Sequence, residues 1–330
     1  STPIKSSAAS DVYKRQVSNA ALLRRRIRDP RFSMELYGVG RRSRSDVAIC
    51  YISDSVDQSV LNRMRKLIQS IDVDALTMNI ESLAECMFTH KWINPFPKFK
   101  YSERPDTATA AILDGNIVIM VDNSPAVMII PASIFDIIEE ADDFNFSPMI
   151  GSYLRITRFF FSIVTWILTP LWLLFVNNPD WVPEFMKFVL ITDDITVPVL
   201  LQLLILELAV DGLKLAAVNT PTMLSTPLSI VAGIVVGEYA VSSGWFNPEA
   251  LLYMAVVTVG TYGQTNFEMG YAFKFLRVLT LILTQIFNLG GFIAGVVISV
   301  LMIAFNRTIT GKSYISVSYT HLRAHETTLH

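Results

Sequence analysis

The sequence contains few of the residues on which metal and redox chemistry depend. Only two cysteines, Cys50 and Cys86, occur among 330 residues, and they form neither a C-x-x-C pair nor a zinc-binding spacing with a histidine. Three of the four histidines lie among the last ten residues, which leaves His90 alone in the body of the chain. These absences argue against a zinc site and a disulfide framework, and they indicate a reducing compartment.

Motifs for catalysis and nucleotide binding are also lacking. The sequence has no Ser-His-Asp set, no H-E-x-x-H and no P-loop, and Gly38-x-Gly40 is followed by two arginines rather than by a glycine that opens a helix. No aromatic residues alternate with the basic ones in a way that suits nucleic acid. We therefore expect no enzymatic activity, no catalytic residue, no cofactor, no metal and no nucleic-acid partner.

Charge is absent from four long stretches in the second half of the chain. Residues 159–176, 220–237 and 250–267 each run for 18 residues without a charge, and residues 278–306 run for 29. A membrane span needs about 20 mainly apolar residues, and the mean hydropathy of +0.42 is high. The sequence predicts an α/β cytosolic domain followed by an α-helical polytopic transmembrane domain, bound to a lipid bilayer.

The two ends fit neither part. Residues 1–16 and 315–330 show no periodicity and resemble translated adapter sequence, so we expect both to be non-native. The domains expected between them are an N-terminally truncated cytosolic domain, 17–153, and a helical membrane domain, 154–314, with about four to six membrane segments.

The soluble part has alternating strand and helix patterns. Residues 46–52 and 117–121 are apolar and rich in β-branched residues, and 126–130 follows the second across a turn at 122–125. Apolar residues recur at helical spacing from Val56 to Ile71, with Ser53 or Asp54 as the predicted N-cap. A second helix is predicted at 79–90.

Basic residues suggest an orientation in the membrane. Residues 21–46 hold eight arginines, which form a solvated cytosolic face or contact anionic lipid headgroups. We interpret Arg155, Arg158, Lys274 and Arg277 as loop charges, which places the N-terminal domain in the cytosol under the positive-inside rule. We expect the tryptophans at 172, 181 and 245 at the outer interface. Residues 278–306 form either one long helix or a hairpin broken at Asn288-Leu289-Gly290-Gly291, and we favour the hairpin.

Three charges interrupt the apolar stretch 199–222. Glu207, Asp211 and Lys214 fall within about 60° of one another on a helix of ~100° per residue, and a charge facing lipid costs at least ~2.5–3.5 kcal/mol. They therefore line an ion path, form an Asp211–Lys214 pair within the helix, or lie at the headgroup level. Nearby, Gly233-x-x-x-Gly237 is a small-xxx-small motif that suits helix packing.

Several segments together resemble one known family. They are YSERPDTATAAILDGNIVIMVDNSPAVMIIP (101–131), IGSYLRITRFF (150–160), VPVLLQLLILELAVDGLKLAAVNTPT (197–222) and STPLSIVAGIVVGEYAV (225–241). They resemble the GerA family of spore germination proteins, and look nearest to its stage V sporulation protein AF branch rather than to the nutrient germinant receptor A subunits. The family's first cytosolic subdomain has no counterpart here.

The resemblance implies a multi-pass protein of the spore inner membrane, with the N-terminal domain facing the cytosol of the spore core. It further implies a subunit of an oligomeric cation channel that releases ions at germination, working with other membrane subunits and a lipoprotein. A non-conducting scaffold or signalling subunit of a germination receptor complex and a secondary transporter remain as alternatives. The transporter needs internal repeats, and no matching second half is found.

Overall fold

The computed structural model describes residues 21–315, apart from 88–93, 145, 220–232, 310 and 312. The chain divides into two compact units, one of residues 1–137 with 303–330 and the other of residues 138–302. We call them the sheet unit and the helical unit. The expected boundary lay after residue 153, whereas in space the helical unit begins at 138 and the chain after 303 belongs to the sheet unit.

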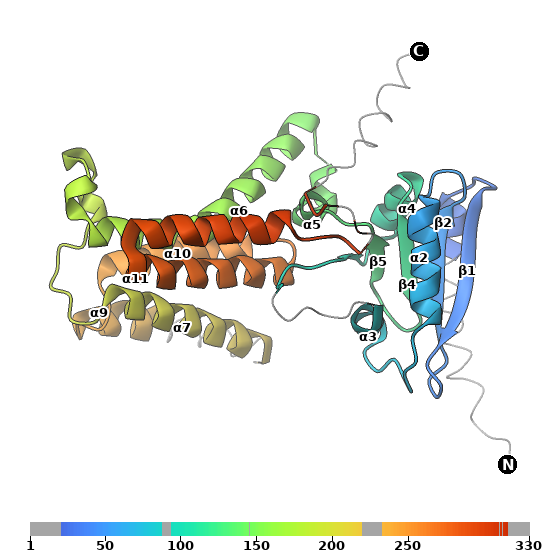
Figure 1. Cartoon of the computed structure of the whole chain (residues 1–330), viewed down its shortest axis with the longest axis horizontal. Helices are drawn as coiled ribbons and strands as arrows, with labels where there is room; N and C mark the ends of the chain where they lie inside the picture. The colour runs from blue at the N-terminus through green and yellow to red at the C-terminus, as the bar shows by residue number, and fades with distance from the viewer. Residues whose placement is uncertain are drawn as a thin grey trace. The chain divides into compact units, whose positions relative to one another are not determined.

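The sheet unit is built on a five-stranded antiparallel sheet (Figure 1) with strand order β1-β2-β4-β5-β3. The strands are β1 (Phe32–Val39), β2 (Ser45–Ile52), β3 (Lys100–Ser102), β4 (Ile117–Val121) and β5 (Val127–Ile130). Its helices are α2 (Gln58–Gln69), α3 (Asn79–Met87), α4 (Pro105–Leu113) and α5 (Ile134–Ile138), the last ending at the unit boundary.

Both faces of this sheet are covered, which explains why its central strands are apolar throughout. Val47, Ile49 and Tyr51 point to one face, where they pack in a cluster with residues of α2 and α3. The intervening Ala48 and Cys50 point to the other face, towards α4 and residues 21–27. A strand has a side-chain period of two, so a strand buried on both faces is apolar at every position.

The expected α/β architecture is confirmed, with local differences. The strands predicted at 46–52, 117–121 and 126–130 are β2, β4 and β5. The predicted N-cap was wrong, because α2 begins later and its cap is Asp57, whose Oδ1 accepts from the Ser59 amide at 3.0 Å. The second predicted helix is α3, which ends at Met87, and His90 lies outside the described residues. Strand β1 was missed because it lies among the arginines of 21–46.

Three of those arginines make contacts within the sheet unit. Arg24 donates to the Phe32 carbonyl at 3.0 Å, Arg31 pairs with Asp29 and Asp54, and Arg41 pairs with Asp72 at 2.7 Å. Exposed pairs of this kind contribute little, about 0–1 kcal/mol. Contact of this arginine-rich stretch with anionic lipid stays a prediction.

Glu35 of β1 holds a half-buried polar network between the sheet and α2. Its carboxylate accepts from Arg65 Nε at 2.9 Å and Nη2 at 2.5 Å, from Tyr51 Oη at 2.5 Å and from Tyr37 Oη at 2.7 Å. The Arg65 guanidinium is the main cause that lowers the pKa of Glu35 from 4.5 to about 2. The network therefore joins β1, β2 and α2 through one ionised carboxylate.

Because the folded-state pKa of Glu35 is lowered, its ionised form stabilises the sheet unit above pH 4.5, and this contribution is lost as the pH falls towards about 2. We expect Glu35→Gln to remove that part of the acid sensitivity and to lower stability at neutral pH. Urea unfolding of the two proteins at several pH values checks this. A free-energy difference between them that is the same at pH 2 and pH 6 would contradict it.

Residues 305–315 complete the sheet unit after the last helix. Tyr314 is fully buried, donates from its hydroxyl to the Pro97 carbonyl at 2.8 Å, and meets Phe96 edge-on with the ring centroids 6.0 Å apart. Its carbonyl accepts from the Ile134 amide at 3.0 Å. The sheet unit is therefore assembled from two stretches that are distant in the sequence.

The helical unit contains α6 (Pro148–Asn177), α7 (Val199–Asn219), the π-helix η4 (Gly233–Tyr239), α9 (Ala240–Ser242), α10 (Pro248–Tyr262) and α11 (Phe267–Ala304). Helix α10 packs against α6 and α7. The core that these three helices share with α11 includes Leu173, Leu203, Met254 and Leu281. Trp172 also lies in this core, where its indole Nε1 donates to the Val189 carbonyl at 2.8 Å. Its ring and its polar atom are both satisfied inside the helical unit, and its place at the outer interface stays a prediction.

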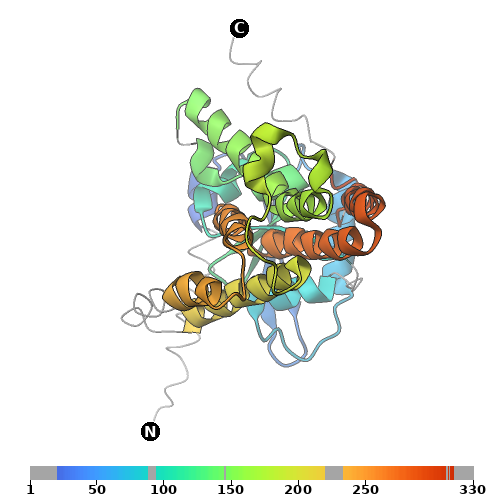
Figure 2. The ribbon, with the colours of Figure 1, turned by 90° about the vertical axis from the view of Figure 1, so that its left-hand side faces the viewer.

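Helix α11 is a hairpin, as favoured from the sequence. Asn288 has a non-helical backbone, with φ 51° and ψ −128°, and divides α11 into arms 267–287 and 289–304. The arms lie next to each other in Figures 1 and 2, and Gly295 of the second arm contacts Thr280 of the first. The side-chain amides of Asn288 and Asn178 exchange two hydrogen bonds of 2.6 and 2.9 Å, which fix the turn against the end of α6.

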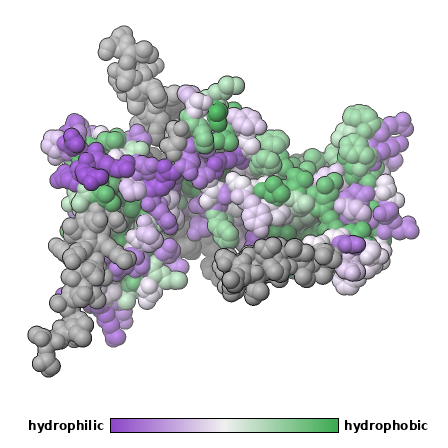
Figure 3. All heavy atoms as spheres, turned by 180° about the vertical axis from the view of Figure 1, so that it is seen from behind, coloured by the Kyte–Doolittle hydropathy of each residue, from purple (hydrophilic) through white to green (hydrophobic). Residues whose placement is uncertain are grey.

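Apolar side chains are exposed over much of the helical unit (Figure 3), whereas hydrophilic side chains cover much of the sheet unit. Phe160, Leu208, Val259 and Phe287 are each at least 60% exposed. In the described part of the chain, α6 and α11 are long and apolar enough to cross a membrane, the length of α11 being that of its two arms together. A water-soluble monomer rarely exposes so much apolar surface, so this surface suits lipid or other subunits.

Candidate functional site: a buried charge cluster in the helical unit

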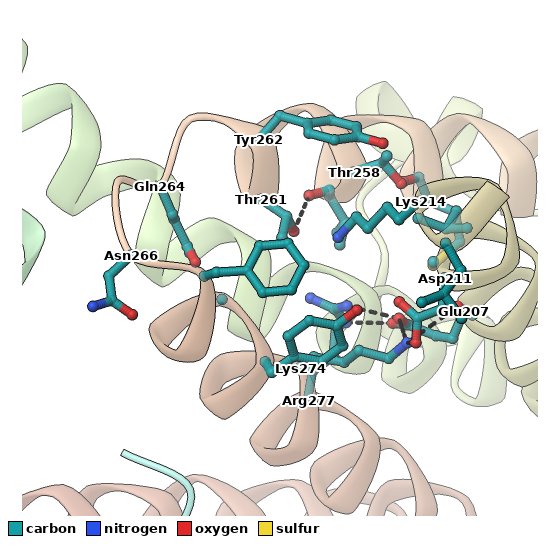
Figure 4. A pocket seen from close by; sticks show the side chains of 17 residues that line it. Glu207, Asp211, Lys214, Thr258, Thr261, Tyr262, Gln264, Asn266, Lys274 and Arg277 are labelled. Carbon is teal, nitrogen blue, oxygen red and sulfur yellow. Dashed lines mark hydrogen bonds and ion pairs between the residues drawn. The ribbon is translucent and has the colours of Figure 1, made fainter. Parts of the chain in front are cut away.

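Helix α7 carries the three charges singled out in the sequence, and all three line one cavity (Figure 4). The cavity has a volume of about 320 Å³ and is enclosed by α7, α10, α11 and the α10–α11 loop. Gln202 sets α7 against the start of α10, because its amide exchanges hydrogen bonds of 2.7 and 2.8 Å with Asn247. Because Glu207, Asp211 and Lys214 all line this cavity, the shared helical face predicted from their spacing is present.

Glu207 is bound by Arg277 of α11. Arg277 Nε and Nη2 donate to the two carboxylate oxygens at 2.5 and 2.8 Å, a bidentate arrangement, while Nη1 donates to the Thr165 carbonyl of α6 at 2.5 Å. The Arg277 side chain is 3% and the Glu207 side chain 5% exposed. One guanidinium thus joins three helices and satisfies its charge and most of its donors.

Asp211 is bound by Lys274, also on α11. The Lys274 ammonium contacts Asp211 Oδ2, donates to the Glu207 carbonyl at 3.1 Å and lies 3.5 Å from Glu207 Oε2. The second oxygen, Asp211 Oδ1, is buried and has no hydrogen-bond partner among the described residues. Of the alternatives left open from the sequence, the Asp211–Lys214 pair within α7 is not the one formed here, because Lys274 of α11 pairs with Asp211.

Lys214 faces two aromatic rings instead of a carboxylate. Its ammonium lies 5.3 Å from the ring centroid of Tyr262 and 5.7 Å from that of Tyr271. Such cation–π contacts stabilise a partly desolvated ammonium by about 0.5–2 kcal/mol. Lys214 therefore lines the cavity without an ion pair to a described residue.

The cavity therefore holds three basic side chains (Lys214, Lys274 and Arg277) against two acidic ones (Glu207 and Asp211). Polar side chains of Thr258, Thr261, Gln264 and Asn266 complete its lining. Water entering such a cavity has polar partners. In this conformation both carboxylates are already occupied by cationic side chains, so the cavity presents no free pair of acids.

Sequence reasoning missed Lys274 and Arg277 as site residues and treated both as loop charges. The structure places them within α11, so this use of them in the positive-inside argument was wrong. Both lie in the helix that begins at Phe267. Lys274 is 63 residues from Asp211 and Arg277 is 70 residues from Glu207 in the sequence, so spacing could not reveal either pair.

Gly233 and Gly237 lie apart from this cluster, in η4. Both are exposed, and a Cβ built on either would meet no described atom within 4 Å. The described chain thus gives them no close neighbour, and their role in helix packing stays a prediction. Among the described residues, no group of three or more His, Cys, Asp or Glu side chains is placed to hold a metal ion.

The sequence matches the family described as Bacillus/Clostridium GerA spore germination protein over residues 14–329. The chain belongs to the GerA family. Stage V sporulation protein AF of Bacillus subtilis (strain 168) is 38% identical over 288 residues, which cover 87% of this chain and 58% of that protein. Spore germination protein GerLA of Bacillus cereus is 27% identical over 307 residues, 92% of this chain and 60% of that protein.

The chain thus spans about three fifths of the length of these GerA relatives. The crystal structure of the N-terminal domain of the A subunit of the Bacillus megaterium spore germinant receptor GerK3 is 32% identical to this chain. The match covers 34% of this chain and 88% of the crystallised chain, with a TM-score of 0.27. The resemblance seen in residues 101–131, 150–160, 197–222 and 225–241 is confirmed at the level of the family.

Proposed function

We propose that this protein is a membrane subunit of the spore germination machinery and that its buried charge cluster forms part of a cation path in an oligomer. It spans the spore inner membrane several times, with the sheet unit facing the cytosol, and works with other germination membrane subunits and a lipoprotein. The GerA family and the exposed apolar surface of the helical unit support the location. The cluster at Glu207 and Asp211 supports the path.

The observation that carries the proposal is Asp211. One of its oxygens is buried without a partner in the described part of the chain, and Asp211 lines a polar cavity among otherwise apolar helices. An unsatisfied carboxylate oxygen in such a place costs stability. A passing cation would satisfy it, as carboxylates do in cation-selective pores.

In the conformation described, Lys274 acts as a tethered cation that occupies Asp211 and prevents a free ion from binding there. Movement of α11 away from α7 would separate this pair and open the carboxylate to ions. We therefore interpret the structure as the closed form of the path. A trigger at germination then needs only to shift one helix relative to another.

One observation favours the non-conducting alternative. Arg277 binds Glu207 through two hydrogen bonds and the α6 backbone through a third, which is also what a helix-locking contact in a scaffold subunit requires. In that case the charges serve only to hold α6, α7 and α11 together. The two functions differ in whether a reversed charge pair still works.

Asp211→Asn is expected to slow ion release at germination by about tenfold or more. A charge-assisted contact is worth ~1.5–3 kcal/mol, and a loss of that size in an ion's binding energy changes a rate by that factor. The measurement is potassium efflux from spores that carry the full-length variant in place of the related native subunit, with protein levels followed by immunoblot. Glu184→Gln is the matched control, because its side chain is 93% exposed and outside the cavity.

The reversed pair Asp211→Lys with Lys274→Asp separates the two functions. An ion path needs the carboxylate at the position of Asp211, so the reversed pair should remain as slow as Asp211→Asn. Normal efflux from the reversed pair would instead support the scaffold. Normal efflux from Asp211→Asn would remove this residue from the path.

A further inference from the structure

A second cavity, of about 600 Å³, lies in the sheet unit where the chain leaves α11. Three basic residues line it, Arg63 of α2, Lys98 and Arg307, and no acidic residue is among the described residues around it. Arg63 and Arg307 are exposed, and neither guanidinium makes a hydrogen bond or ion pair with a described residue. The cavity is therefore strongly basic and has unused donors.

Asn306 adds a buried donor to this cavity. It is 2% exposed, and its Oδ1 accepts from Asn94 Nδ2 at 2.8 Å and from the Lys98 ammonium. Because both of these partners are donors, they fix the orientation of the amide. Its Nδ2 is then a donor, and none of the residues that the structure describes accepts from it. A buried donor without a partner in a cavity of this size requires an acceptor.

Lys98 has a structural role that does not account for the rest of the cavity. Its ammonium is held by Asn306 and by the Arg307 carbonyl at 2.8 Å, and it lies 5.5 Å from the centroid of the Tyr314 ring. These contacts fix residues 306–314 to the sheet unit. They leave the guanidinium groups of Arg63 and Arg307 and the Asn306 amide nitrogen without a function in the fold.

We propose that this cavity binds an oxyanion of the phosphate type, either free or as the phosphate of a larger ester. Guanidinium groups match the oxygens of phosphate with paired hydrogen bonds, and a tetrahedral anion has enough acceptors for two arginines and the Asn306 amide at once. The volume falls within the ~300–1,000 Å³ that small-molecule sites occupy. It leaves room for an organic group on the phosphate. The inference does not depend on the cation path proposed above.

Two sources offer this chemistry. Phe305, which follows the end of α11 and also lines the cavity, is 78% exposed. If α11 crosses the bilayer, basic residues at this point lie near the depth of lipid headgroups, where anionic lipids are attracted. A soluble phosphate or phosphate ester reaches the same side chains from the water phase. Both sources bring the same charged group to the same donors.

The first test uses the full chain purified in a detergent free of phospholipid and titrates inorganic phosphate by calorimetry at constant ionic strength. Asn306→Asp keeps an acceptor for Asn94 and Lys98 but replaces the free donor with a negative oxygen. The double variant Arg63→Gln, Arg307→Gln is tested as a separate protein. Each of the two variants should weaken phosphate binding by about tenfold or more, as the loss of a charge-assisted contact implies. Arg42→Gln is the control, because Arg42 is an exposed arginine of the same unit outside the cavity.

The second test places the same proteins in nanodiscs of phosphatidylcholine with or without phosphatidylglycerol and counts retained lipids by native mass spectrometry. Phosphate binding that depends on these residues identifies a soluble ligand. Retention of phosphatidylglycerol that depends on them identifies a headgroup. Either result supports the site. If both variants behave like Arg42→Gln in both tests, the proposal is overturned. If Asn306→Asp fails to fold, the result of the arginine double variant alone supports or overturns the proposal.

Discussion

Arg277→Leu is expected to lower the free energy of unfolding of the helical unit by about 3–5 kcal/mol, because it leaves a buried carboxylate without its main partner. Among the described residues, the Glu207 carboxylate retains Lys274 alone, at 3.5 Å and already bound to Asp211. The Thr165 carbonyl loses its contact with the guanidinium as well. The measurement is the thermal unfolding of the detergent-solubilised protein, together with its yield from membranes.

The double variant Glu207→Gln, Arg277→Met tests whether the loss comes from the charge left behind. Removing both charges is often close to neutral, so the double variant should regain most of the stability that Arg277→Leu loses. Lys187→Met breaks an exposed pair with Glu184 and should change stability by less than about 1 kcal/mol. A double variant as unstable as Arg277→Leu would show that side-chain volume, rather than charge, dominates.

Gly291→Ala is expected to destabilise the α11 hairpin by about 1–3 kcal/mol or more, the range for overpacking a well-packed contact. A Cβ at residue 291 would overlap the Leu283 carbonyl and lie 3.0 Å from the Thr284 amide nitrogen. These are backbone atoms of the first arm, so no rotamer change can relieve the contact. Thermal unfolding checks the size of the effect.

Gly290 gives a matched control one residue away. A Cβ there would meet nothing within 4 Å, so Gly290→Ala should be neutral or should stabilise the helix by up to about 1 kcal/mol, as alanine replaces glycine in a helix. Equal effects at 290 and 291 would contradict the hairpin, because in a straight helix Gly291 would not meet the backbone of residues 283 and 284.

Local patterns in the sequence predicted the elements whose signals lie close together. The strands around Ile49, Ile119 and Ile129 follow from apolar runs bounded by turn residues, and the break at Asn288 follows from an Asn-Leu-Gly-Gly segment inside an apolar run. The α2 cap was placed three or four residues too early, because Ser53, Asp54 and Asp57 are all good caps and spacing alone does not separate them.

The charge cluster was only half predictable. Glu207, Asp211 and Lys214 share one face of a helix, which spacing reveals, and the cost of burying them shows that they need partners. Which residues those partners are depends on how α7 and α11 pack, and one sequence carries no signal for a contact across more than 60 residues. Arg277 could still have been suspected, because an arginine ten residues after Phe267 extends too far into an apolar helix to be a loop charge.

Tyr314 is made by the ribosome about 180 residues after Ile134, whose amide binds its carbonyl. Until the helices between them have been synthesised, the place beside Phe96 and Pro97 that its ring fills stays empty. The sheet unit is thus completed only after α11 has been made, and its final packing reports that the chain has returned to it.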